Sequence, residues 1–378
     1  MGPLAGLKVV ELVGLAPAPF AATVLADLGA DVVRVDRVKP GFDIPVLPRD
    51  PLSRSRRWIG VDTKSTEGRD IVLHLVAEAD VLIEGYRPGV TERLGLGPDD
   101  CLVRNPRLVY GRITGWGQDG PMAKAAGHDI NYIGLSGALE PIGRAGERPV
   151  PPLNLLGDFG GGGMLLAMGV LAALVERSVS GQGQVVDASM VEGSALLAAS
   201  MFGLRNIGLW QGGRGSNMLD GGAPFYDTYE TSDGKYVAVG AIEERFWGDL
   251  VKVLELDPSS VAGRLDPARW EAVRAELASV IRTRTRDEWA ARAAGTDACL
   301  TPVLEPLEAP SHPHNVARGS FVTLEGDVQP APAPRFSRTA ADTPTPPVEP
   351  RSSTGAVLAE LGYSSSDIDR LRTGGVIA

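Results

Sequence analysis

The chain of 378 residues has only two cysteines and four histidines. Cys101 and Cys299 lie far apart without C-x-x-C spacing, which excludes a disulfide framework and a zinc site built on cysteines. We therefore expect reduced thiols and a cytoplasmic protein. The formal net charge of −10 argues against broad nucleic-acid binding, because such binding depends on neutralising phosphates.

The sequence also lacks a basic leader followed by an apolar segment, and no apolar run reaches membrane-spanning length. The longest such run, from Met164 to Leu174, predicts a core helix, so no membrane partner is expected. With 43% hydrophobic and 22% charged residues, the composition is that of an ordinary globular protein. A chain of this length favours two domains.

The amino-terminal residues predict a β-α-β unit. Residues 7–12 have the pattern of a strand, residues 20–28 form an Ala/Leu-rich helix, and residues 31–35 form the next strand. Further strands are predicted at 80–84 and 108–114, with helices between them. This alternation predicts an α/β fold with a Rossmann-like, doubly wound large domain.

A change in character after the middle of the chain predicts a second, smaller α+β domain, which contains a hairpin near residues 228–239. The last part of the chain is rich in proline, so we expect it to return in extended form over the large domain. The predicted divisions are residues 1–210 for the first part of the large domain, 211–221 for a linker, 222–315 for the small domain, and 316–378 for the return segment and tail.

The first β-α turn has Pro17 and Pro19 where a dinucleotide-binding turn has G-x-G-x-x-G, which disfavours a nicotinamide-dependent dehydrogenase. Basic residues recur instead after the predicted strands, where open α/β sheets bind their ligands. Each of them alone could serve solubility or salt bridging, but as a set they suit a ligand with several phosphates. They are Arg37, Lys64, Arg87 and Arg93.

Two glycine-rich helix starts carry the most informative residues. His128 lies in the first, Gly127–Tyr132, and Asp158 precedes the glycine run 160–163 in the second. Helix N-termini offer unpaired N–H groups and positive potential, so an imidazole and a carboxylate there indicate proton transfer beside a stabilised anion. A free histidine titrates near pH ~6.5, whereas Asp158 would need a raised pKa to serve as an acid, which partial burial against the apolar helix could supply.

Each of these residues also has a purely structural interpretation. His128 beside Asp129 could be a satisfied pair at a helix start, and Asp158 could be an N-cap. Glu243 follows a predicted strand of the small domain, where it could orient an imidazole or simply be a surface acid.

At these residues the chain resembles the family III CoA-transferases over essentially its whole length, and within them the α-methylacyl-CoA racemases. The resemblance rests on the stretches 127–132, 151–159 and 218–224. In the transferases, the aspartate at the position of Asp158 is the nucleophile that carries an acyl group. A histidine at the position of His128 marks the racemase branch.

The resemblance implies that His128 and Asp158 flank the α-carbon of a 2-methylacyl-CoA thioester and epimerise C2 through an enolate. It implies that Glu243 holds and polarises the histidine from the small domain, and that the backbone N–H of Asp129 donates to the enolate oxygen. It further implies an interlocked homodimer. The implied CoA-binding positions are Arg37, Val61, Asp62, Thr63, Lys64, Gly85, Tyr86, Arg87, Arg93, Gly127, Ile130, Asn131 and Tyr132.

Two alternatives stay open from the residues alone. One is a CoA-transferase that uses Asp158 as an acyl-accepting nucleophile, and the other is an acyl-CoA-binding protein without turnover. CoA would be part of the substrate, so neither a separate cofactor nor a metal is expected. The preferred acyl chain (branched fatty acyl or sterol side chain), the base that serves each enantiomer, and the part of the loop 38–54 in CoA binding are not predicted.

Overall fold

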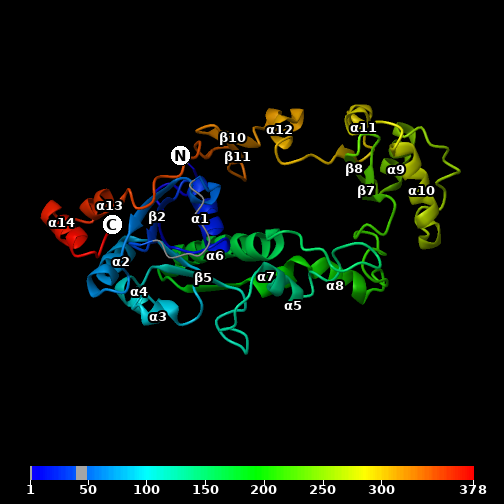
Figure 1. Cartoon of the computed structure of the whole chain (residues 1–378). Helices are drawn as coiled ribbons and strands as arrows, with labels where there is room; N and C mark the ends of the chain where they lie inside the picture. The colour runs from blue at the N-terminus through cyan, green and yellow to red at the C-terminus, as the bar shows by residue number, and fades with distance from the viewer. Residues whose placement is uncertain (1, 40–48) are drawn as a thin grey trace. The chain divides into compact units, whose positions relative to one another are not determined.

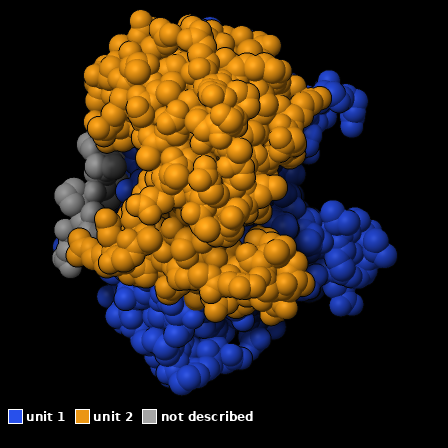
Figure 2. Space-filling model, turned by 90° about the vertical axis from the view of Figure 1, so that its right-hand side faces the viewer, with its two compact units in different colours: residues 1–136, 153–197, 313–378 blue, residues 137–152, 198–312 orange. Residues whose placement is uncertain are grey.

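A computed structural model describes residues 2–39 and 49–378, so residues 40–48 of the loop 38–54 lie outside the described residues. The chain forms two compact units, coloured separately in Figure 2. The second unit takes residues 137–152 and 198–312, which includes part of the segment expected in the large domain and the whole expected linker. The first unit takes residues 1–136, 153–197 and 313–378. The predicted boundaries of the large domain, the linker and the small domain stay a prediction.

The first unit is built on a six-stranded parallel sheet with the order β3-β2-β1-β4-β5-β6. Figure 1 labels β2 and β5 of this sheet. The chain winds outward from β1 in one direction and then from β4 in the other, which is the doubly wound order predicted from the sequence. The strands are β1 (Lys8–Leu12), β2 (Asp31–Asp36), β3 (Arg56–Gly60), β4 (Val81–Glu84), β5 (Val109–Thr114) and β6 (Val185–Ser189).

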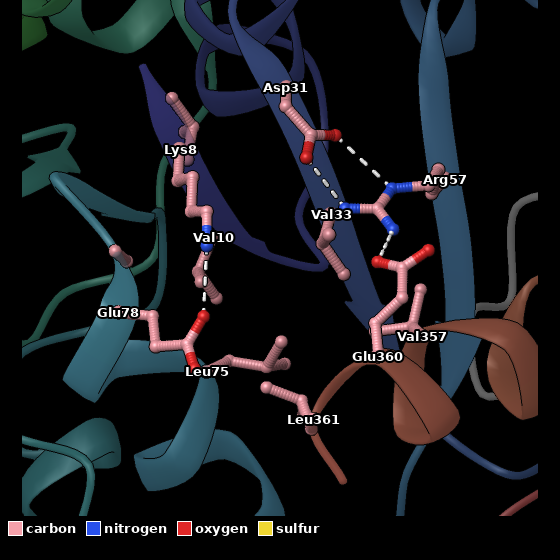
Figure 3. Close-up of a pocket in the computed structure, with 12 residues that line it drawn as sticks. Lys8, Val10, Asp31, Val33, Arg57, Leu75, Glu78, Val357, Glu360 and Leu361 are labelled. Atoms are coloured by element: carbon pink, nitrogen blue, oxygen red, sulfur yellow. Dashed lines mark hydrogen bonds and ion pairs between the residues drawn. The ribbon is translucent and has the colours of Figure 1, made fainter. Parts of the chain in front are cut away.

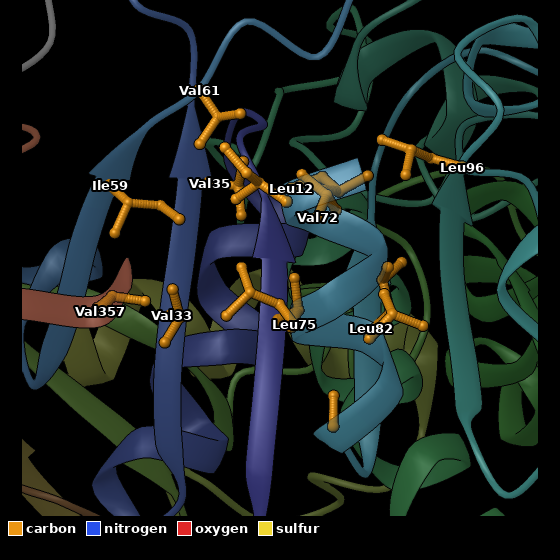
Figure 4. Packing of buried hydrophobic residues seen from close by; sticks show 14 of the residues in the cluster. Leu12, Val33, Val35, Ile59, Val61, Val72, Leu75, Leu82, Leu96 and Val357 are labelled. Carbon is orange, nitrogen blue, oxygen red and sulfur yellow. The ribbon is translucent and has the colours of Figure 1, made fainter. Parts of the chain in front are cut away.

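The strands carry nearly continuous apolar runs, so both faces of the sheet must be buried, and helices cover both of them. On one face, Val9 and Val32 pack against α1 and α6. On the other, Leu12, Val33 and Val35 pack against α2 and the carboxyl-terminal α13, as Figure 4 shows. The helices of this unit are α1 (Pro17–Asp27), α2 (Thr66–Glu78), α3 (Val90–Arg93), α4 (Pro98–Arg104), α5 (Asp129–Leu135), α6 (Leu165–Ser180), α7 (Met190–Leu197), α12 (Pro313–Arg318), α13 (Thr354–Glu360) and α14 (Ser365–Thr373).

Helix α1 begins three residues earlier than predicted. Pro17 occupies its first turn, where the missing N–H of proline costs no hydrogen bond and its fixed φ favours the helix. The prolines that argued against a dinucleotide turn therefore start the helix itself. Three short elements complete the unit: the 3-10 turn η1 (Pro51–Ser53) and the hairpin strands β10 (Phe321–Leu324) and β11 (Asp327–Pro330).

A stretch of π-helix, η2 (Leu155–Met164), runs directly into α6 and makes one continuous helix from Leu155 to Ser180. Within the described residues, this helix has the length and mean hydropathy, 1.7, that a membrane span requires. The expectation that no apolar segment reaches that length was therefore wrong, because the polar Asp158 does not interrupt the helix. Leu166, Ala167 and Val170 are buried in the core under the sheet, as predicted for a core helix.

The second unit has a three-stranded antiparallel sheet with the order β7-β8-β9 and helices packed on it. The predicted hairpin is confirmed, because Tyr226–Glu230 pairs with Tyr236–Gly240. The elements are α8 (Ala199–Asn206), β7 (Tyr226–Glu230), β8 (Tyr236–Gly240), α9 (Glu244–Val253), η3 (Pro267–Arg269), α10 (Trp270–Ile281), α11 (Arg286–Ala293), β9 (Leu300–Pro302) and η4 (Ala309–Ser311).

Candidate active site

A cavity of about 330 Å³ lies in the first unit at the carboxyl ends of the strands. Its walls come from the loops after β1, β4 and β5, together with the starts of α5 and η2. His128 and Asp158 both line it. The two residues that the sequence selected from separate glycine-rich helix starts are thus brought to one cavity.

His128 is fixed through its backbone at the start of α5. It has an extended conformation as the N-cap, and its N–H donates to the side-chain oxygen of Asn131 at 3.0 Å. The hydroxyl of Tyr132 donates to the carbonyl of Gly127, and the Tyr132 ring meets that of Trp116 edge-on at a centroid separation of 4.8 Å. The backbone on both sides of His128 is therefore held by residues of its own motif.

Asp158 lies in the first turn of η2 and is half-buried. π-Helical turns in proteins are frequently found at functional sites. Burial raises the pKa of the Asp158 carboxyl, and the negative charge of Asp129 raises it further. A hydrogen bond of 3.1 Å from the Asn154 amide and the proximity of His128 act in the opposite direction. The net direction is upward, which a carboxyl group needs if it is to act as an acid near neutral pH.

The side chain of Asp129 links the two helix starts. This residue is 6% exposed, and its Oδ2 accepts the N–H groups of Gly157 at 2.6 Å and of Asp158 at 2.7 Å. The approach leaves no room for a side chain at Gly157, because a Cβ there would lie 2.5 Å from that oxygen. Sequence reasoning considered only the backbone N–H of Asp129 and missed its carboxylate.

A second cavity of about 800 Å³ adjoins the ends of β2, β3 and β4. Most of the predicted CoA-binding positions line one cavity or the other, and Arg37, Tyr86 and Arg87 line both. The lining positions are Arg37, Val61, Asp62, Thr63, Lys64, Gly85, Tyr86, Arg87, Gly127 and Tyr132.

Three predicted positions do not line either cavity in the described part of the chain. The side chain of Asn131 instead accepts the His128 N–H, and Ile130 is 45% exposed. Arg93 lies in α3, where its backbone N–H donates to the carbonyl of Gly89 at 3.3 Å. A role for these three in CoA binding stays a prediction.

An acidic residue that the sequence analysis did not select supports the loop after β4. Glu84 is fully buried, and its carboxylate accepts the Tyr86 N–H at 2.7 Å and the Arg112 Nε–H at 3.0 Å. Burial raises the pKa of Glu84 to about 7, against the opposing effects of these two donors. The only sequence signal was an acid at the end of an apolar strand.

Glu243 belongs to the second unit, where it is the exposed N-cap of α9. Its charge raises the pKa of the neighbouring Cys299 thiol, although burial of the thiol contributes more. Cys299 also lines a cavity of about 610 Å³ on the β7-β8-β9 sheet. The role of Glu243 in orienting a histidine stays a prediction.

A further pocket of the first unit differs in its charges. It lies between β1, β2, α2 and α13, at the amino ends of the strands and thus at the edge opposite the candidate active site (Figure 3). Lys8 bonds to Glu78 at 2.9 Å, and Arg57 bonds to both Asp31 and Glu360. The charged groups drawn at this edge bond to one another, so their substitution provides controls for the opposite edge.

Comparisons with known proteins agree with this arrangement. The sequence profile described as "CoA-transferase family III" matches residues 4–352. The chain is 46% identical to the "Alpha-methylacyl-CoA racemase" of Mus musculus over 99% of its length and 97% of that protein, and equally identical, with the same coverage, to the protein of that name from Homo sapiens. The crystal structure of a "CAIB/BAIF family protein from Brucella suis" superposes with a TM-score of 0.80 and 27% identity, over 95% of this chain and 99% of that one. The chain therefore belongs to CoA-transferase family III.

Proposed function

We propose that this chain epimerises 2-methylacyl-CoA thioesters at C2 by a 1,1-proton transfer, with His128 and Asp158 as the acid/base pair. The observation that carries the proposal is that both side chains line one cavity at the carboxyl edge of the sheet. The names of the mouse and human relatives point to the same reaction.

In the proposed reaction, one of the two groups removes the C2 proton of the bound thioester. The electron pair of the C–H bond then forms the C1–C2 double bond of an enolate, and the carbonyl electrons move to oxygen. The second group, protonated, returns a proton to the opposite face of C2. The thioester bond stays intact, so the product is the C2 epimer and no second substrate is consumed.

The difficult step is the build-up of negative charge on the carbonyl oxygen, because a thioester α-proton is only weakly acidic. Asp129 is the first residue of α5, so its backbone N–H has no intrahelical acceptor. We assign this N–H as the donor to the enolate oxygen. A single prearranged donor of this kind contributes about 3 kcal/mol to the stability of such a transition state.

Exchange of the C2 hydrogen in heavy water tests the two-base assignment. His128→Ala and Asp158→Ala should each lose epimerisation strongly, while both still bind the CoA part of the substrate. The control is Arg57→Ala, which alters only the ion pairs at the opposite edge of the sheet and should retain activity. Turnover near the wild-type rate in either cavity variant would refute the two-base scheme.

The second candidate function is a CoA-transferase reaction with Asp158 as the nucleophile, as the name of the family itself indicates. There, the Asp158 carboxylate attacks the thioester carbonyl, the CoA thiolate leaves, and a mixed anhydride forms. Hydroxylamine would trap this anhydride as a hydroxamate at Asp158. Trapping at that residue, together with absence of C2 exchange, would favour the transferase.

We further propose that the chain acts as an interlocked homodimer. One side of the continuous helix carries exposed apolar side chains at Met164, Met168, Val175 and Val179, which we call the α6 stripe. Exposed apolar surface of this extent marks an interaction site, and the proposed occupant is a second copy of the chain. In this dimer, Glu243 of one subunit polarises the histidine of the other.

Mixing subunits tests this assignment. His128→Ala and Glu243→Gln homodimers should each have low activity. Their refolded mixture should recover about a quarter of the wild-type activity, because about half of the dimers are hybrid and each hybrid contains one intact pair out of two. Unchanged activity in the mixture of refolded subunits would refute the exchange of Glu243 between them. The proposed location of the enzyme is the cytoplasm.

A further inference from the structure

We infer that the carboxylate of Asp129 is a positioning group, which holds the segment that carries Asp158 against the residue next to His128. The two groups of the proposed proton transfer thereby keep a constant separation. This inference rests on the proposed function, in which Asp129 contributes only its backbone N–H. It adds a role for the side chain of the same residue.

The first step of the argument is the hydrogen bonding at the start of η2. The first N–H groups of a helix have no intrahelical acceptor, and a π-helix leaves one more of them than an α-helix. Asn154, the N-cap, does not supply one from its side chain, which donates to Asp158 instead. Oδ2 of Asp129 accepts two of these N–H groups, those of Gly157 and Asp158. The start of η2 is therefore capped by Asp129, a residue of α5.

The second step concerns rigidity. Asp129 follows His128 directly, and its two bonds are 2.6 and 2.7 Å long, as expected for charge-assisted hydrogen bonds. Gly157 is buried and packs directly on the Asp129 side chain, because a Cβ there would lie 2.5 Å from Oδ2 and 2.9 Å from Cγ. The link is thus short, charged and closely packed on both sides.

The third step is the cost of this arrangement. The other oxygen of the carboxylate, Oδ1, is buried and lacks a hydrogen-bond partner in the described residues. A buried carboxylate with one unpaired oxygen costs folding free energy, so a contribution to stability alone does not explain this arrangement. It does, however, place a negative charge beside Asp158, and the pKa of Asp158 is raised in part by that charge.

The charged and polar neighbours of Asp158 determine what a substitution would change. His128 comes from the start of α5, Asn154 from the start of η2, and Tyr132 from the next turn of α5. In Asp129→Asn, an amide oxygen can still accept both N–H groups, but the charge is lost. In Asp129→Ala, the link and the charge are both lost. The pair of variants thereby separates geometry from electrostatics.

The experiment compares kcat, KM and the pH profile of C2 exchange for the wild type, the two Asp129 variants and Asp80→Asn. The matched control Asp80 also accepts a backbone N–H, from Lys8 at 2.9 Å, and pairs with Arg177 at 2.8 Å, at the other edge of the sheet. Asp129→Ala should lose about 100-fold in kcat with KM nearly unchanged, because a displacement of the order of 1 Å has this effect on a reacting group. Asp129→Asn should recover most of this loss, and the acid limb of its pH profile should move to lower pH, because the charge that raises the pKa of Asp158 is removed.

A direct titration keeps the inference independent of turnover. With ¹³C-labelled aspartate carboxyls, the Asp158 signal is assigned by its loss in Asp158→Asn and is then titrated in the wild type and in Asp129→Asn. A lower pKa in Asp129→Asn supports the inference even if the wild type exchanges no C2 hydrogen, in which case the proposed function alone fails. If Asp129→Ala behaves like Asp80→Asn in kcat, or if the Asp158 titration is the same in both proteins, the inference is wrong.

Discussion

Substitution of Gly157 by alanine tests the contact with Asp129 from its other side. The new Cβ would lie 2.5 Å from Asp129 Oδ2 and 3.2 Å from Ile133 Cγ2, whereas a relaxed contact needs at least 3.4 Å. The two side chains cannot both stay in place. Either the carboxylate moves away from the N–H groups of residues 157 and 158, or the start of η2 moves away from α5.

The magnitude follows from the bonds that are lost. Hydrogen bonds to a charged acceptor contribute about 1.5–3 kcal/mol each, so two of them contribute about 3–6 kcal/mol. Alanine recovers about 1 kcal/mol of this through its better helix propensity. We therefore expect Gly157→Ala to destabilise the first unit by about 2–5 kcal/mol and to reduce kcat in parallel, because the same movement displaces Asp158.

Urea unfolding and C2 exchange measure the two effects. The control is Gly203→Ala in α8, because a Cβ at Gly203 meets nothing within 4 Å and should only stabilise its helix. If Gly157→Ala unfolds within about 0.5 kcal/mol of the wild type and retains its kcat, the close packing of Gly157 on Asp129 does not hold the site, and the reasoning fails.

Three further predictions concern other parts of the first unit. Glu84 has a folded pKa of about 7 against a reference of 4.5, so its protonated form stabilises the fold and this contribution is lost as the pH rises through 7. In urea titrations, the stability of Glu84→Gln relative to the wild type should therefore rise between pH 4.5 and 7. A difference in stability that stays constant over this range would show that the carboxylate remains ionised in the folded protein. Arg87→Ala should raise KM for an acyl-CoA about tenfold, which corresponds to about 1.4 kcal/mol, and should leave kcat nearly unchanged. The control Arg57→Ala should leave KM unchanged, and equal effects of the two substitutions would remove Arg87 from the CoA site. Met168→Glu in the α6 stripe should convert dimers to monomers in sedimentation equilibrium. The control Val103→Glu, at a residue of α4 that is 85% exposed, should leave the dimer intact. A dimeric Met168→Glu protein would contradict the proposed interface.

The sequence predicted the parts of the fold that follow from local patterns. The strand-helix-strand start, the parallel sheet and the hairpin of the second unit have clear periodicities, and the structure confirms them. The strand before Lys64 was expected but not given bounds, because the sequence of β3 begins Arg56-Arg57 and does not look buried. Arg56 is nevertheless buried, since its guanidinium donates to Glu11 of β1 at 2.7 Å. An ion pair between distant strands leaves no local signal.

The same distinction applies to the site. His128 and Asp158 could be selected because glycine-rich helix starts are visible in a sequence, and the cavity that both line was an expectation that the structure meets. The Asp129 carboxylate and Glu84 could not be selected, because their importance lies in which N–H groups they accept. Such partners are separated along the chain or depend on a turn that the pattern does not specify.

The packing of the carboxyl-terminal helices on the sheet has a consequence for biosynthesis. Val357 and Leu358 of α13 and Leu371 of α14 belong to the same apolar core as β1 and β2, and the N–H of Ala378 donates to the carbonyl of Gly60 in β3. The ribosome completes these helices only after the entire second unit has emerged. The part of this face that α13 and α14 cover therefore remains exposed until those two helices are made, and apolar surface exposed during synthesis is prone to aggregation.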